Sequence, residues 1–284
     1  MAGKKLRLKK LSLRNSFTIF KEALLFSYRT FSAIIVQTFP VNPMDSLDAP
    51  PVRVVYRKYQ DGILPAYHHP PYTSSVKRSP RQPLVPLPQT LSELTAPTFV
   101  PPETIPSINL AKGPHGDAVG ERILVSGRVL DEDGRAVPGT LVEIWQANAA
   151  GRYLHARDQH DAPLDPNFTG CAYFVTDPAG RFAFETIRPG AYPWRNHYNA
   201  WRPAHIHFSV FGPAFATRLI TQMYFPGDPL LPFDPIFNSI PHEAARNRLI
   251  ASFNWDTTIP DYGLGFQFNI VLRGSEQTPM ENKP

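Results

Sequence analysis

The chain has 284 residues, of which 42% are hydrophobic and 19% charged, a composition typical of a globular protein with one large domain or two modest ones. Its 32 prolines argue against an all-helical protein, because proline removes a backbone donor and breaks helices. The net charge of +5 arises in residues 1–43, where eight Lys or Arg and one Glu give +7 and leave −2 for the rest, so we expect no nucleic-acid partner.

Residues 1–43 form a basic tail that we exclude from the fold. Its apolar stretch Leu24–Phe39 is interrupted by Arg29, so no uninterrupted run reaches the roughly 20 residues of a membrane-spanning helix, and we expect no membrane partner. The tail could be a transit-like peptide or a surface amphipathic helix. Because Met44 follows directly, we favour a third interpretation, upstream sequence read from the wrong start.

The single cysteine, Cys171, excludes an internal disulfide and favours a reducing, cytoplasmic location. A lone cysteine could be a catalytic nucleophile. We interpret it as a small apolar residue in a strand.

Residues 44–110 are rich in proline and show no helical periodicity, which predicts an extended arm lying on another subunit or on its own core. Residues 111–284 contain short alternating segments between Gly and Pro turns, which predict a mainly β protein, a β-sandwich with few short helices. A turn at 131–134 predicts that the first two strands form a hairpin, and Pro241 suits the start of a helix near 241–252. The expected strands are 123–129, 140–147, 173–176, 182–187, 205–211, 218–225 and 264–273.

His205 and His207 are two residues apart in a predicted strand, so both imidazoles point to one face and can approach one metal ion. The alternative is two polar residues on a solvated face. No HExxH pattern, cysteine cluster or carboxylate at helix spacing accompanies them, and Asp165 and Asp177 lie in turn sequences. Tyrosine is the remaining abundant oxygen donor, and a phenolate suits a hard ion such as Fe(III). Arg202, three residues before His205, could stabilise an anion formed at the metal.

Four segments of the chain resemble the intradiol ring-cleavage dioxygenases. Within that family they are similar to the β subunits of the members that cleave protocatechuate, as are residues 79–82 and 224–229. The resemblance runs from about residue 65 to Gly274 and does not cover residues 1–43. Two tyrosines 39 residues apart and followed by H-x-H are its most specific feature. The four segments are ANAAGRY at 147–153, LDPNF at 164–168, RPGAYPWR at 188–195 and WRPAHIHF at 201–208.

The resemblance implies a transthyretin-like (prealbumin-like) sandwich that binds one Fe(III) per chain. It implies cleavage of protocatechuate (3,4-dihydroxybenzoate) by O2 to 3-carboxy-cis,cis-muconate, and an α subunit as partner in a higher αβ assembly. The implied metal ligands are Tyr153, Tyr192, His205 and His207. The implied catalytic residues are Tyr192, Arg202 and Gln222, and the implied substrate-binding residues are Tyr72, Trp145, Trp194 and Ile236.

Two other functions fit part of the pattern. A homodimeric intradiol dioxygenase for catechol or hydroxyquinol usually carries a helical N-terminal domain, which the proline-rich arm does not resemble. An iron-free, transthyretin-like binding module would share the sandwich but would not need the tyrosines and histidines. The chain also departs from the family at 196–199, where we interpret His197 as a loop residue, and at Phe233 and Asp234, which flank Ile236 and could reshape substrate access.

Overall fold

The computed structural model describes residues 60–83, 85, 108–194, 201–211 and 218–281, all within one compact unit, Val55–Pro284. The basic tail, most of the proline-rich arm and His197 lie outside the described residues. None of the helices in the described ranges is long and apolar enough to cross a membrane. The proposed division between arm and catalytic domain at residue 110 stays a prediction.

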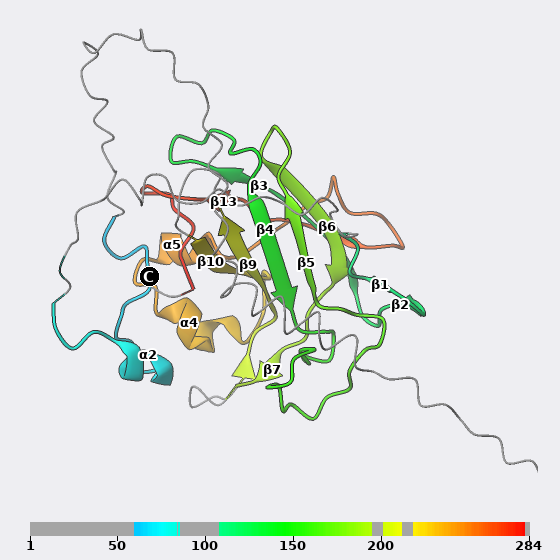
Figure 1. The fold of residues 1–284 in the computed structure, drawn as a ribbon, viewed down its shortest axis with the longest axis horizontal. Helices are drawn as coiled ribbons and strands as arrows, with labels where there is room; N and C mark the ends of the chain where they lie inside the picture. The colour runs from blue at the N-terminus through cyan, green and yellow to red at the C-terminus, as the bar shows by residue number, and fades with distance from the viewer. Residues whose placement is uncertain (1–59, 84, 86–107, 195–200, 212–217, 282–284) are drawn as a thin grey trace, which may run out of the picture. The chain divides into compact units, whose positions relative to one another are not determined.

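One sheet has four antiparallel strands in the order β10, β9, β4, β5 (Figure 1). Each strand turns alternate side chains toward the second sheet, as Ile206, Phe208 and Val210 of β9 do. The strands are β4 Leu141–Gln146, β5 Cys171–Val175, β9 His205–Phe211 and β10 Arg218–Tyr224.

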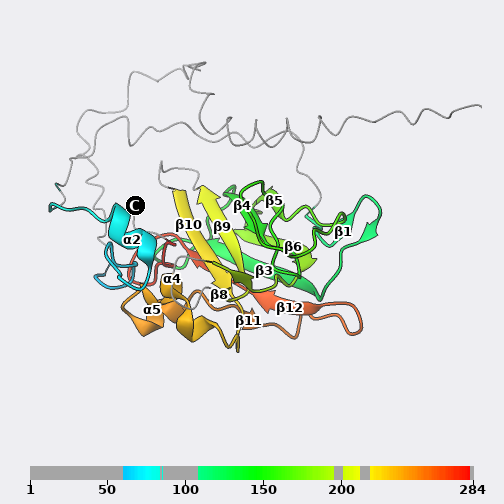
Figure 2. The ribbon, with the colours of Figure 1, turned by 90° about the horizontal axis from the view of Figure 1, so that it is seen from below.

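The second sheet is built around β3 (Arg122–Leu130), the longest strand, which pairs antiparallel with β6 and parallel with β12 and β13. Figure 2 shows β3 and β12 as a layer beneath β9 and β10. Phe208 of the first sheet contacts Phe182, Phe184 and Phe268, so aromatic rings fill the space between the layers. The other strands are β6 Arg181–Ile187, β11 Ser252–Phe253, β12 Leu264–Gln267 and β13 Ile270–Val271. The predicted β-sandwich is confirmed.

A second apolar cluster joins the described start of the arm to the helices that follow β10. Ile63 and Leu64 lie in it with Tyr224, Phe237 and Leu249. The arm backbone is hydrogen-bonded there too, since the Ala66 amide donates to the Ser239 carbonyl at 2.8 Å. This part of the arm therefore lies on its own core. The helices are α2 Thr73–Arg78, η1 Leu231–Phe233, α4 Pro235–Asn238 and α5 Glu243–Asn247.

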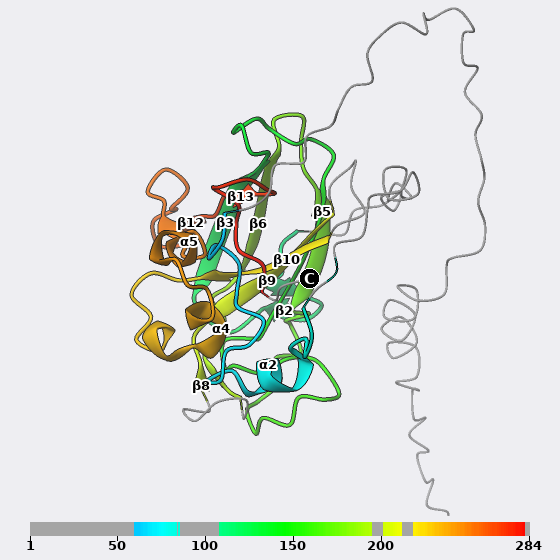
Figure 3. The ribbon, with the colours of Figure 1, turned by 90° about the vertical axis from the view of Figure 1, so that its left-hand side faces the viewer.

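Two short strand pairs complete the fold. β1 (Lys112–Gly113) pairs with β2 (Gly116–Asp117), and β7 (Tyr192–Pro193) pairs with β8 (Trp201–Arg202). Helices α2 and α4 and the β7–β8 pair lie toward one end of the four-stranded sheet (Figures 1 and 3). This end carries the candidate site.

The predicted hairpin is wrong. The turn at 131–134 is present, but β3 and β4 belong to opposite sheets, so the chain crosses from one layer to the other between them. The strand expected at 264–273 is divided into β12 and β13. The helix expected at 241–252 is the shorter α5, which begins after His242, and α2 and α4 were not predicted.

Candidate metal centre and active site

His205 and His207 lie on the face of β9 that is turned away from the sandwich core. Trp145 of β4 and Gln222 of β10 are the direct cross-strand neighbours of His207, and Tyr224 is that of His205. Residues paired in this way share one face of a sheet. The strand register therefore gathers these five side chains, and both histidines are almost completely buried.

The two imidazoles are oriented by groups on their outer nitrogens. Nδ1 of His205 donates to the carbonyl of Pro203 at 2.8 Å, and Nδ1 of His207 lies 3.1 Å from a carboxylate oxygen of Glu281. Each bond directs the Nε2 lone pair inward, and the two Nε2 atoms are 3.2 Å apart. Burial, with the nearby Arg202 and His207, holds the pKa of His205 well below its usual value. A neutral imidazole with a free lone pair is the form that binds metals.

Tyr153 and Tyr192 lie beside the histidines. The Tyr192 hydroxyl is 3.4 Å from Nε2 of His205, and the Tyr153 ring is 5.2 Å edge-on from that of Tyr192 and 6.4 Å from that of His207. The Tyr153 hydroxyl is buried, and no described residue hydrogen-bonds to it. Burial, with Tyr192 nearby, raises its pKa well above the usual value. An unpartnered buried hydroxyl is unfavourable, and a cation would supply the missing partner.

The four predicted ligands therefore converge, and their chemistry fits a hard cation. A metal ion would accept the facing Nε2 lone pairs of His205 and His207 and bind the Tyr153 oxygen, which no described residue contacts by a hydrogen bond. It would also lower the pKa of the tyrosine hydroxyl. Within the described ranges no three His, Cys, Asp or Glu side chains gather into a metal site. Asp165 and Asp177 accept hydrogen bonds from nearby backbone amides, as turn residues do.

Local turns present the two tyrosines. The Tyr153 amide donates to the carboxylate of Asp158 at 2.7 Å, which fixes the loop after β4. Tyr192 is paired across β7 and β8 with Arg202. Gly151 has a φ of +76°, and a Cβ there would lie 2.1 Å from the Ala191 carbonyl oxygen, so only glycine allows the two tyrosine segments to approach this closely.

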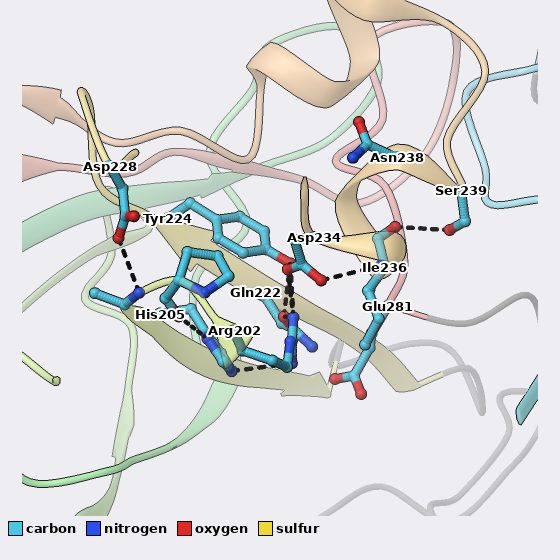
Figure 4. Close-up of polar contacts among 12 residues, drawn as sticks. Arg202, His205, Gln222, Tyr224, Asp228, Asp234, Ile236, Asn238, Ser239 and Glu281 are labelled. Atoms are coloured by element: carbon cyan, nitrogen blue, oxygen red, sulfur yellow. Dashed lines mark hydrogen bonds and ion pairs between the residues drawn. The ribbon is translucent and has the colours of Figure 1, made fainter. Parts of the chain in front are cut away.

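Arg202 is buried at the centre of a polar network (Figure 4). Its Nη1 lies 3.2 Å from Nε2 of His205 and 3.4 Å from the Tyr192 hydroxyl. Its Nη2 donates to Gln222 and Asp234, each at 2.6 Å. Burial alone would lower the pKa of Arg202, but Asp234 outweighs it and the pKa is raised well above its usual value. The guanidinium thus remains charged beside the candidate metal ligands.

The predicted substrate-binding residues lie around this network. The indole of Trp145 stacks on the His207 ring at 4.7 Å with 6° between the planes. The Trp194 ring lies 5.2 Å from the guanidinium carbon of Arg202 and 5.4 Å from the ring of Tyr72. Ile236 is buried in α4, and its amide donates to Asp234.

Asp234, Tyr224 and Glu281 belong to the site, although the sequence patterns did not assign them to it. Asp234 was predicted only as a flanking residue. The Asp-Pro pair at 234–235 is a typical helix start and was a readable signal for α4. Glu281 is brought to His207 across 74 positions of sequence, and no local pattern indicates it.

Comparison with known proteins identifies the family of the chain. A family profile described as "Dioxygenase" matches residues 94–274, and one described as "Protocatechuate 3,4-dioxygenase beta subunit N terminal" matches residues 60–90. The chain belongs to the intradiol dioxygenase family. Intradiol dioxygenases use non-haem iron, so the fit of the four ligands to a hard cation agrees with the family's chemistry.

Among intradiol dioxygenases, the chain is 59% identical to the protocatechuate 3,4-dioxygenase beta chain of Burkholderia cepacia, over 76% of this chain and 93% of that one. It is 30% identical to the protocatechuate 3,4-dioxygenase alpha chain from the same organism, over 58% of this chain and 78% of that one. The solved structure of 3-chlorocatechol 1,2-dioxygenase from Rhodococcus opacus 1CP is 24% identical, with a TM-score of 0.47 over 63% of this chain and 70% of that one.

Proposed function

We propose that this intradiol dioxygenase is the iron-binding β subunit of a protocatechuate 3,4-dioxygenase. The observation that carries the proposal is the convergence of His205, His207, Tyr153 and Tyr192, with two imidazole Nε2 atoms 3.2 Å apart. The buried Tyr153 hydroxyl also has no hydrogen-bond partner among the described residues. These residues would hold one Fe(III) per chain. The similarity to a protocatechuate 3,4-dioxygenase beta chain supports the choice of substrate.

Bound Fe(III) would act as a Lewis acid on the catechol and draw electron density from it, so that its ring becomes open to attack by O2. The reaction converts protocatechuate and O2 to 3-carboxy-cis,cis-muconate. Both oxygen atoms enter the product, so no external reductant is required.

Tyr192 is the better placed tyrosine to accept a substrate proton. Both tyrosine side chains are partly buried, but the Tyr153 hydroxyl has no hydrogen-bond partner among the described residues. The Tyr192 hydroxyl, in contrast, lies 3.4 Å from Nη1 of Arg202, which stabilises a phenolate until the proton arrives. Tyr153 would thus remain a permanent ligand while Tyr192 takes up the proton.

Arg202 and Gln222 would stabilise negative charge that develops on the substrate ring. Nη1 of Arg202 is already directed toward the metal ligands, and a preorganised donor in a dry site needs little rearrangement during the reaction. Trp145, Trp194 and Ile236 would form apolar walls that exclude water, with Tyr72 beyond Trp194.

We also propose an α subunit as partner, because the similar proteins include both an alpha and a beta chain. The two chains should be co-expressed, purified and tested for iron, visible absorption and O2 uptake. We expect one iron per β chain, a tyrosinate-to-Fe(III) absorption band, and at least tenfold higher kcat/KM with protocatechuate than with catechol or hydroxyquinol. A colourless, iron-free protein that folds would contradict the proposal, and a preference for catechol or hydroxyquinol would overturn the substrate.

A further inference from the structure

Asp234 is completely buried between η1 and α4, yet the reaction proposed above gives it no task. Its Oδ2 accepts hydrogen bonds from Nη2 of Arg202 at 2.6 Å and from the Tyr224 hydroxyl at 2.8 Å. Its Oδ1 accepts from the amide of Ile236 at 3.1 Å (Figure 4). One carboxylate therefore joins an arginine of the site to the helix that carries a predicted pocket residue.

The contacts of Arg202 divide its guanidinium into two halves. Nη2 faces Asp234, Gln222 and Tyr224, whereas Nη1 faces Tyr192 and His205. A guanidinium is planar and rigid, so fixing the direction of Nη2 also fixes the direction of Nη1. The half of the guanidinium that faces the candidate metal ligands is thus aimed by the half that is bonded to Asp234.

Asp234 also supplies the negative charge that a buried guanidinium requires. It forms the ion pair that the described residues provide for Arg202, and both side chains are shielded from water. A buried cation left without its partner is strongly destabilised and tends to move toward water or another acceptor. Because the pair is neutral, Arg202 acts on the site through directed hydrogen-bond donors more than through net charge.

The same carboxylate caps α4. Asp234 is the residue before the first turn, its side chain accepts from the Ile236 amide, and Pro235 occupies the first helical position. Movement of α4 would therefore shift Ile236 and the anchor of Arg202 together. The pocket wall and the charged donor are held in one geometry.

We propose that Asp234 is a positioning residue, which aims the Arg202 guanidinium at the reacting substrate and keeps it in register with Ile236. This inference rests on the proposed dioxygenase function. If Asp234 had only a structural role, its loss would affect folding and iron retention alone. A positioning role would in addition lower the turnover of each iron-loaded site, and this difference separates the two roles.

The first test is Asp234→Asn in the co-expressed αβ enzyme. The asparagine side chain has a single oxygen, which can accept a hydrogen bond from the Ile236 backbone N–H or from Nη2 of Arg202, but not from both. The negative charge beside Arg202 is also lost. We expect kcat per bound iron with protocatechuate to fall about tenfold or more, and KM to change less than threefold. Wild-type kcat per bound iron in this variant would overturn the proposal.

Asn238→Ala is the matched control. Asn238 lies on the same helix, and its side chain donates to the Pro232 carbonyl at 2.8 Å. We expect it to keep wild-type kcat per iron. If it reduces kcat per iron as much as Asp234→Asn does, loosening of α4 explains the effect and the proposal fails.

A double-mutant cycle with Arg202→Gln tests whether Asp234 acts through the arginine. We expect the double variant, Arg202→Gln with Asp234→Asn, to have the kcat per iron of Arg202→Gln alone, within about twofold. If the loss of kcat per iron in the double variant equalled the product of the losses in the two single variants, Asp234 would act independently of Arg202, and the proposal would be overturned.

If Asp234→Asn does not fold, Asp234→Glu tests the same point, because it keeps the charge and displaces it by one methylene. We expect it to bind iron and to lower kcat per iron about tenfold, whereas an unchanged kcat would overturn the proposal. Wild-type enzyme must first show iron, colour and protocatechuate-dependent O2 uptake. Failure there would contradict the proposed function, whereas normal wild-type activity with unaffected Asp234 variants would contradict this inference alone.

Discussion

Glu281 places a carboxylate oxygen 3.1 Å from Nδ1 of His207. The C-terminal segment is fastened along β10, because the Glu281 amide donates to the Ile220 carbonyl and the Thr221 hydroxyl donates to the Pro279 carbonyl, each at 2.7 Å. Burial alone would raise the pKa of Glu281, but His207 and other nearby donors lower it to about 2. Glu281 therefore orients His207 as a carboxylate.

Glu281→Gln should weaken iron binding by about 10- to 100-fold, the usual effect of losing an outer partner of a metal-binding histidine. The glutamine keeps the size of the side chain but removes the charge that orients the imidazole. Iron affinity is measured by competition with a chelator. Glu276→Gln is the control, since Glu276 pairs with Arg248 and its side chain is 70% exposed. Equal iron affinity in both variants would contradict the role of Glu281.

Tyr192→Phe should retain iron but slow substrate binding and proton uptake by about tenfold or more, because proton transfer by a positioned group contributes at least that much. Stopped-flow absorption and a pH indicator would follow the two events. Tyr262→Phe should leave both unchanged, since the Tyr262 hydroxyl contacts Arg122 and Glu185 on the other sheet. Unchanged kinetics in Tyr192→Phe would rule out its role as proton acceptor.

Cys171 should react slowly with thiol reagents. Its side chain reaches the surface at the start of β5, but desolvation of the sulfur, with Glu143 nearby, raises the pKa of the thiol. A raised pKa means less thiolate at every pH below it, so alkylation by iodoacetamide should have its midpoint above that of a free cysteine peptide. A midpoint at or below the peptide value would contradict this.

Cys171→Ser should keep O2 uptake within about twofold of wild type, because surface substitutions away from a site have small effects. A large loss of activity with normal iron content would revive the nucleophile interpretation of Cys171.

Gly127→Ala should destabilise the sandwich. A Cβ at this position of β3 would lie 1.8 Å from the carbonyl oxygen of Phe268, so the strand would have to move. Overpacking of this kind costs roughly 1–3 kcal/mol, which corresponds to a melting temperature lower by about 2–12 °C in a protein of this size. Thermal denaturation of the iron-loaded protein measures this change in melting temperature. Ser126→Ala, at the neighbouring position of β3, is the control and should change it less. An unchanged melting temperature would contradict the close approach.

The sequence predicted most strands and the pairing of His205 with His207, because alternation and the H-x-H spacing are local signals. Tyr153 and Tyr192 were assigned through the family resemblance, and the ligand set stays a proposal. Strand pairing is not local. β3 and β4 both alternate and flank a good turn, but the choice of sheet depends on which residues fill the core between the layers. Likewise Arg202 and Asp234 are 32 positions apart, and burial of the guanidinium becomes visible only once η1 and α4 cover it.

His205 and His207 reach the proposed metal site from a strand held between two neighbours, with Gln222 on one side and Trp145 on the other. A shift of β9 by one residue would turn both imidazoles into the apolar core and bring Ile206 out in their place. Variation within this strand can therefore proceed by substitution but not by insertion or deletion of a single residue. Over evolutionary time, we expect length changes in this protein to accumulate outside β9.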